Sequence, residues 1–240
     1  MYGRCTSEQL KKIAMGTMFI DHAAVALIYN CGLDKVNPFF ETLGIAMRLI
    51  GRMAFPLYAF LLVQGFLYTR DWKKYVVRVA VFAVISEIPY NLVAGKAILY
   101  PAGQNTMFTM LVGLLCMKAI SGLENFARRT GDLWQFWVET VLIAGIGGMV
   151  AEICHLDYGM YGILLLMVFY MFRFRPAEQL MGGCAVLFLM YQNFYAFAAW
   201  IAIFLISRYN GERGRKMGYW PYIFYPAHLL VLAVAGMILQ

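Results

Sequence analysis

Long, uncharged apolar runs recur along this chain and restrict it to a small set of folds. Examples are LVLAVAGMIL at 230–239, ILLLMVFYMF at 163–172 and AAWIAIFLIS at 198–207. Of the 240 residues, 62% are hydrophobic and only 14% are charged, whereas soluble domains carry about a quarter charged residues. A soluble domain of this size cannot bury so much apolar surface. The pattern therefore predicts an all-α, polytopic bundle of membrane-spanning helices.

The runs predict about eight to nine transmembrane helices within a single domain, residues 1–240. No internal repeat, flexible linker or low-complexity tract separates them, and the first run is too long for a cleavable signal. Segment 31–50 is expected to be a short helix at the outer surface rather than a span. The predicted spans are 10–30, 51–69, 74–94, 105–122, 134–152, 158–173, 177–191, 194–208 and 220–239.

The region 177–208 leaves the number of spans open. Two helices of about 14 residues each reach only about 21 Å, short of the ~30 Å hydrocarbon core. The region is compatible with two thin spans, a broken pair or one long bent helix. We expect two spans, because a single helix would move the following basic loop to the outer side.

Basic residues alternate between the two sides of this arrangement. With the N-terminus in the cytoplasm, the outer segments hold four of the 20 Lys and Arg residues, and the other sixteen fall on the inner side. The outer four are Lys35, Arg48, Arg52 and Lys96. This excess is typical of cytoplasmic loops. The net charge of +7 therefore indicates orientation in a cell membrane, among lipids, rather than binding of nucleic acid.

Asp21 and His22 interrupt the first apolar run. They lie about ten residues beyond Lys11 and Lys12, which places them about 15 Å into the membrane, near its midplane. A charged group there costs at least about 2.5–3.5 kcal/mol, so such residues usually face a polar cavity or a partner. The alternative to a functional site is that Asp21 caps a helix or pairs with a basic group, and that His22 is a neutral, hydrogen-bonding residue in the helix bundle.

Other polar residues form smaller candidate groups. Arg52, Gln64 and Glu87 lie within or at the ends of the second and third spans, and an Arg52–Glu87 ion pair is one structural interpretation. Glu152 and His155 have a spacing that some metal ligands share, but one such pair is interpreted as structural. The five cysteines have no CxxC spacing, and we expect no metal site.

Four cations follow one another around a predicted cytoplasmic turn: Arg70, Lys73, Lys74 and Arg78. Such a cluster attracts a polyanionic ligand, although positive-inside anchoring with anionic lipid is the commoner explanation for it. Tyr225 and His228 lie in the last predicted span, on its cytoplasmic half.

Several of these stretches together resemble the TraX family of membrane proteins, which is named for a conjugative-plasmid protein associated with pilin acetylation. The resembling stretches occur in the same order and cover nearly the whole chain. They are LKKIAMGTMFIDHAA at 10–24, GRMAFPLYAFLLVQGFLYTRDWKKYVVRVAVFAVISEIPYNL at 51–92, NTMFTMLVGLL at 105–115, DYGMYGILLL at 157–166 and FYPAHLL at 224–230. That family is similar to a broader group of transmembrane acyltransferases.

The resemblance implies an acetyltransferase that takes acetyl-coenzyme A from the cytosol and an acceptor from the other face. His22 is then the expected general base, supported by Asp21 or Glu87. This chain is shorter than the larger relatives, which is compatible with a reduced acceptor site or with a homodimer that completes it. Amine and hydroxyl acceptors remain open: a pilin-like peptide, a glycan, a teichoic polymer or a small metabolite.

In this hypothesis, acetyl-coenzyme A lies between spans one, two and nine. Its expected ligands are Arg70, Lys73, Lys74, Arg78, Tyr225 and His228, and those of the acceptor are Arg52, Gln64 and Glu87. A competing interpretation is a proton-coupled transporter or lipid flippase in which Asp21, His22 and Glu87 relay protons. A non-catalytic scaffold is the third alternative, but it leaves the buried charges unexplained.

Overall fold

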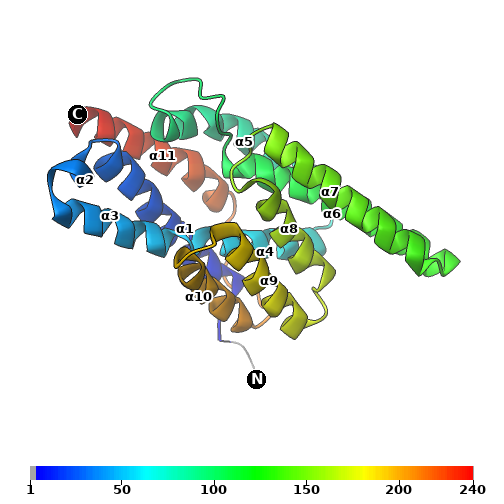
Figure 1. Cartoon of the computed structure of the whole chain (residues 1–240). Helices are drawn as coiled ribbons and strands as arrows, with labels where there is room; N and C mark the ends of the chain where they lie inside the picture. Colours follow the sequence, from blue (N-terminus) through cyan, green and yellow to red (C-terminus); the bar gives the residue numbers. More distant parts are fainter. Residues whose placement is uncertain (1–3, 240) are drawn as a thin grey trace.

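The computed structural model describes residues 4–239, and helices account for nearly all of that range (Figure 1). The first helix continues as a π-helix over Ala24–Tyr29, beginning two residues after His22. The helices are α1 (Ser7–Ala23), α2 (Leu33–Val36), α3 (Pro38–Gly51), α4 (Ala54–Tyr68), α5 (Trp72–Ala94), α6 (Thr106–Thr130), α7 (Leu133–Ile153), α8 (Gly159–Met171), α9 (Pro176–Tyr191), α10 (Tyr195–Ser207) and α11 (Trp220–Leu239).

Six helical stretches are long and apolar enough to cross a membrane, and two shorter apolar helices accompany them. The six are Ser7–Tyr29, Pro38–Tyr68, Trp72–Ala94, Thr106–Thr130, Leu133–Ile153 and Trp220–Leu239, and the shorter two are Gly159–Met171 and Tyr195–Ser207. These elements confirm the predicted all-α, polytopic bundle. The chain is a multi-pass membrane protein.

The predicted surface helix at 31–50 is placed differently by the structure. Residues Pro38–Gly51 pack along α1 and lead into α4 with a short break at Arg52 and Met53, so that Pro38–Tyr68 forms one long apolar stretch. The sequence argument missed this because Glu41 and Arg48 make the segment look amphipathic. As a result Arg48 and Arg52, expected in an outer segment, lie inside the bundle.

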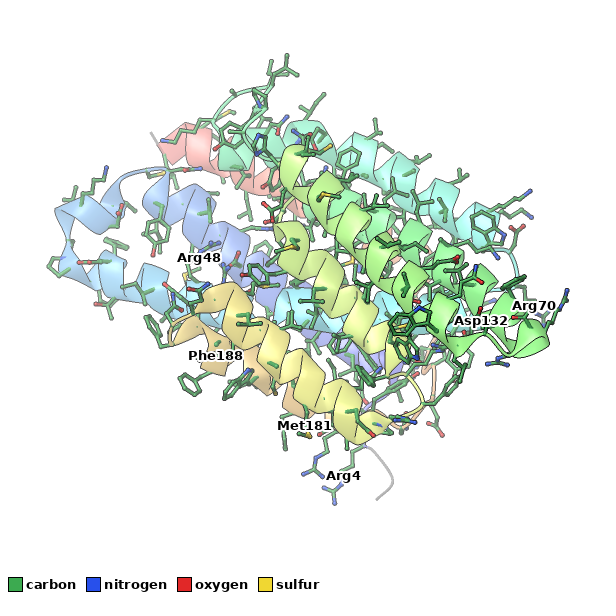
Figure 2. The ribbon with its side chains drawn as sticks, turned by 45° about the vertical axis from the view of Figure 1, so that its right-hand side comes forward. Arg4, Arg48, Arg70, Asp132, Met181 and Phe188 are labelled. Atoms are coloured by element: carbon green, nitrogen blue, oxygen red, sulfur yellow. The ribbon has the colours of Figure 1, made fainter. Side chains whose placement is uncertain are left out.

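Two antiparallel helices occupy the ambiguous region 177–208. α9 ends at Tyr191, Gln192 follows with a φ of 50°, and α10 begins at Tyr195 and packs back against α9. This supports the expectation of two helices over one bent helix. In Figure 2 the side chains of Met181 and Phe188 on α9 point outward, and they are 72% and 52% exposed. A lipid-facing surface explains such exposed apolar side chains.

The main core is centred on α4 and α8. α4 is buried almost throughout, from Ala54 to Val63, because helices pack on it from several sides. A smaller cluster joins α11 to the first helix and to α5 around Leu229 and Val93. There the backbone of Gly236 approaches the carbonyl of Ala26 so closely that a Cβ would lie 2.8 Å from it. Glycine at this position lets α11 approach α1, and this contact positions the site described next.

Candidate active site

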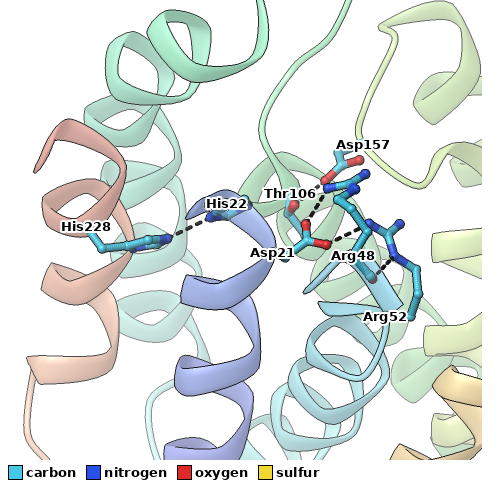
Figure 3. A network of polar contacts seen from close by, with 7 residues as sticks. All are labelled: Asp21, His22, Arg48, Arg52, Thr106, Asp157 and His228. Atoms are coloured by element: carbon cyan, nitrogen blue, oxygen red, sulfur yellow. Dashed lines mark hydrogen bonds and ion pairs between the residues drawn. The ribbon is translucent and has the colours of Figure 1, made fainter. Parts of the chain in front are cut away.

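Two imidazoles meet between α1 and α11. The Nδ1 atom of His22 lies 2.7 Å from Nε2 of His228, and the two rings are within 13° of parallel (Figure 3). The other nitrogen of His228, Nδ1, donates to the carbonyl of Phe224 at 2.6 Å. His228 is 95% buried, at 5% relative exposure. The sequence placed His228 among coenzyme ligands, whereas the structure makes it the direct partner of His22.

Asp21 faces the opposite direction. Its carboxylate accepts from Arg48 at 2.6 Å and from Arg52 at 2.8 Å, so α3 and α4 supply both partners. Only 11% of the Asp21 side chain and 13% of the Arg52 side chain are exposed. Figure 3 shows Asp21 and His22 on different sides of α1, as expected for adjacent helical residues about 100° apart. Asp21 therefore pairs with basic groups, and within residues 4–239 no hydrogen bond links it to His22.

Gly51 makes the approach of Asp21 to α3 sterically feasible. A Cβ at position 51 would lie 2.0 Å from Oδ1 of Asp21, far inside van der Waals contact. The carboxylate thus lies directly on the backbone of α3, between Arg48 and Arg52. No local pattern connected Arg48 to the site, because its partner Asp21 is 27 residues away along the chain.

The remaining predicted acceptor ligands are not joined to this ion-pair cluster. Glu87 on α5 accepts from the side-chain amide of Asn105 at 2.5 Å, and it forms no ion pair with Arg52. Gln64 is half-buried in α4 and makes no hydrogen bond within the described part of the chain. Asp21, His22 and Glu87 thus have three separate sets of partners, rather than one continuous relay.

A second polar group surrounds the turn between α7 and α8. Asp157 accepts from the hydroxyl of Thr106 at 2.5 Å, while its backbone carbonyl accepts from Thr109. Burial raises the pKa of the Asp157 carboxyl, and the hydrogen bond from Thr106 opposes this shift. The sequence analysis treated this loop as structural. The sequence does place Asp157 two residues before an apolar helix, α8, and this position could have indicated a buried carboxylate.

Asp157 lines a hollow of about 480 Å³ at the end of the bundle that holds the α5–α6 loop. Tyr90, Tyr100, Glu152 and Tyr158 also contribute to its walls. The hydroxyl of Tyr225 is buried without a hydrogen bond, and it lies near Thr106, whose own hydroxyl donates to Asp157.

The ring of Tyr225 lies 6.2 Å from that of His22 and 5.9 Å from that of His228, measured between centroids. Tyr225 therefore lies between the hollow and the imidazole pair. It was predicted to contact coenzyme, but its position fits the acceptor side equally well.

The four predicted cytoplasmic cations fall into two groups. Arg70, Lys73 and Lys74 are exposed around the turn between α4 and α5, where Lys74 lies 3.3 Å from Asp71. Hydrogen bonds from Lys74, first that of its backbone amide, lower the pKa of Asp71. Arg78 lies further along α5, over the rings of Tyr219 and Tyr222 at 5.0 and 5.6 Å.

Tyr222 precedes His228 by six residues on α11, which is about 9 Å along the helix. The guanidinium of Arg78 therefore lies about two turns of α11 away from the imidazole pair. Arg78 thus contacts the start of the same helix that carries Tyr225 and His228.

Known proteins resemble this chain along nearly its whole length. A probable fimbrial assembly protein of Dichelobacter nodosus (FimC, serogroup H1) is 26% identical over 262 aligned residues, covering 97% of this chain and 96% of that protein. No solved structure matches the chain. The model of the TraX protein family matches residues 6–235. The chain therefore belongs to the TraX family.

Proposed function

We propose that this protein is a membrane-embedded acetyltransferase, which moves an acetyl group from cytosolic acetyl-coenzyme A to an amine or hydroxyl acceptor on the other face. The observation that carries the proposal is the hydrogen-bonded imidazole pair of His22 and His228, enclosed between two spanning helices. Imidazole is the side chain best suited to accept and return a proton near neutral pH. Membership of a family associated with pilin acetylation supports this chemistry.

In the proposed reaction His22 removes the proton from the acceptor as the acceptor's nitrogen or oxygen attacks the thioester carbonyl. The new bond forms to the acetyl carbon, the carbon–sulfur bond breaks, and coenzyme A leaves as a thiolate that receives the proton from His22. The step is balanced without any further reactant. Holding thioester and acceptor together beside the base supplies much of the rate enhancement.

The two substrates would approach from opposite ends. The exposed cations Arg70, Lys73 and Lys74 suit the coenzyme phosphates, and Arg78 continues toward α11. The hollow lined by Tyr90, Asp157 and Tyr158 suits an acceptor entering from the other side. Arg52 is held by Asp21, so we expect it to support the wall of the site rather than to bind acceptor freely.

The first test measures binding and turnover separately in purified wild-type and His22→Ala protein. We expect acetyl-coenzyme A, but not ATP at the same concentration, to raise the unfolding temperature of both proteins, because a ligand that binds only the folded state stabilises it. Acetyl transfer to envelope material should fall about 10²- to 10⁴-fold in the variant.

Two outcomes would contradict the proposal. Equal stabilisation by ATP would show that the protein binds anions in general. Acetyl transfer by the His22→Ala protein at the wild-type rate would show that His22 is not the base. Proton uptake by proteoliposomes, without any acetyl transfer, would favour the transporter interpretation instead. Mass spectrometry of envelope fractions identifies the acceptor as the molecule that carries an acetyl group in cells with the protein and lacks it in cells without the protein.

A further inference from the structure

We propose that His228 is a positioning residue that holds His22 in the one neutral tautomer whose Nε2 atom is free to accept a proton. The inference rests on the proposed function, because it assigns His22 the role of base. It replaces the sequence-based expectation that His228 contacts coenzyme. The tautomer follows from the contacts of the two ring nitrogens of His228, one with the carbonyl oxygen of Phe224 and the other with Nδ1 of His22.

The first step concerns His228 alone. Its Nδ1 lies 2.6 Å from the carbonyl oxygen of Phe224, four residues earlier on α11. A carbonyl oxygen only accepts hydrogen bonds, so Nδ1 must carry the proton. In a neutral imidazole the second nitrogen is then an acceptor. The Nε2 atom of His228 therefore presents a lone pair to α1.

The second step transfers this constraint to His22. Because Nε2 of His228 accepts, the 2.7 Å contact requires that Nδ1 of His22 donates. Neutral His22 carries no second ring proton, so its Nε2 is unprotonated. The other assignment places the proton on Nε2 of His228 and makes that ring a buried cation, which is costly in a membrane interior.

The ring geometry favours this hydrogen bond. The two nitrogens are 2.7 Å apart whereas the ring centroids are 5.0 Å apart, and the planes differ by only 13°. The rings thus meet edge to edge, with the lone pair directed along the bond. The ring of Phe224 covers one face of His228 at 4.7 Å and 15°. Packing therefore holds His228 in the orientation that the bond needs.

The arrangement also supports the protonated state of His22. After Nε2 takes a proton, the Nδ1–H group still donates to a neutral imidazole, and the charge is shared across a hydrogen bond. Within residues 4–239 no carboxylate is hydrogen-bonded to His22, and Asp21 is bonded instead to Arg48 and Arg52. His228 thus replaces the acidic residue that orients histidine in a serine protease triad.

Nitrogen NMR of the full-length protein tests the tautomer without requiring activity. The chain has three histidines, so ¹⁵N-histidine labelling gives three imidazoles, and His155→Asn assigns the exposed one. We expect protonated Nδ1 and unprotonated Nε2 in both His22 and His228. A protonated Nε2 on neutral His22 would overturn the proposal.

Two variants test the role in turnover. In His228→Gln the side-chain oxygen can still accept from Nδ1 of His22, whereas His228→Phe keeps the ring volume but offers no acceptor. We expect kcat to fall about 10- to 100-fold in His228→Phe, since groups that orient a reacting side chain contribute on this scale. In His228→Gln kcat should be much closer to the wild-type value. The KM for acetyl-coenzyme A should stay within about twofold in both variants, as for an interaction made in the transition state.

The outcomes separate this inference from the proposed function. Wild-type kcat in His228→Phe, or an equal loss in both variants, would overturn the positioning role while His22 remained the base. If the wild-type protein transfers no acetyl group, the proposed function fails, and the nitrogen spectrum still decides which tautomer the pair adopts.

Discussion

At the scale of single residues, the adjacent pair Asp21 and His22 illustrates how a helix separates two polar functions. Asp21 binds two arginines on one side of α1, and His22 binds an imidazole on another. Both side chains thereby have a polar partner, which offsets the cost of placing them in a membrane. Removing one partner of a buried ion pair typically costs about 3–5 kcal/mol, so this cluster should be important for folding.

Gly51 provides a sharp test of that cluster. Gly51→Ala places a methyl group on the Asp21 carboxylate, so we expect a loss of about 1–3 kcal/mol of stability from overpacking and displacement of the Arg48 and Arg52 ion pairs. Gly16→Ala on α1 is the matched control. Nothing lies within 4 Å of its added Cβ, so it should be neutral or stabilise the helix by about 0.5–1 kcal/mol.

Thermal unfolding in detergent compares the two alanine variants directly. An unfolding temperature for Gly51→Ala equal to or above that of Gly16→Ala would contradict the arrangement of Asp21 on the α3 backbone.

At the scale of helices, α11 connects the predicted parts of the site. Tyr222 in its first turn lies against Arg78, as does Tyr219 just before the helix, and further along α11 carries Tyr225 and His228. α11 packs most extensively along α5, which also carries the basic turn at its start. In the proposed function, a coenzyme lying along these two helices would pass from the basic turn to the imidazole pair.

The double variant Lys73→Gln/Lys74→Gln tests the basic turn. Exposed ion pairs contribute about 0.2–1 kcal/mol each, so we expect the Kd for acetyl-coenzyme A to rise about tenfold while kcat at saturation changes little. The dependence of binding on salt should weaken as well. Arg129→Gln in the exposed last turn of α6 serves as control. If the double variant binds acetyl-coenzyme A with unchanged affinity, the basic turn binds anionic lipid rather than the coenzyme.

At the scale of the whole molecule, the alternation of basic loops defines how the bundle is oriented. The α6–α7 turn lies at the end of the molecule opposite the C-terminal end of α11 (Figure 1). If the N-terminus is cytoplasmic, the hollow around Asp157 opens outward and the cations at Lys73 and Lys74 face the cytosol. This orientation is required by the proposed transfer across the membrane.

Cysteine labelling tests the orientation. Cys154 is exposed in the turn between α7 and α8, so in a variant that retains it as the single cysteine we expect a membrane-impermeant maleimide to label intact cells. Arg129→Cys in a cysteine-free background should react only after permeabilisation, because the last turn of α6 is predicted to be cytoplasmic. The reverse pattern would invert the proposed topology and place the hollow in the cytosol.

The sequence by itself determined the class of fold and most of the helices. Each span is a local run of apolar residues, and the bilayer requires every helix to satisfy its own backbone and to present apolar side chains. The same local character identified Asp21 and His22 as unusual, since a charged group inside such a run is costly wherever the helix packs. In the region 177–208 the apolar pattern left one helix or two open, and the structure decided for two, with a turn at Gln192.

Only the tertiary structure decided which polar residues meet. His22 and His228 are 206 residues apart, and Arg48 was expected at the surface because the packing of α3 against α1 is not encoded in its apolar pattern alone. Helix rotation and partner choice in a membrane depend on close packing between distant segments, such as Gly51 beneath Asp21 and Gly236 against Ala26. A local pattern specifies the helix, whereas these contacts specify the site.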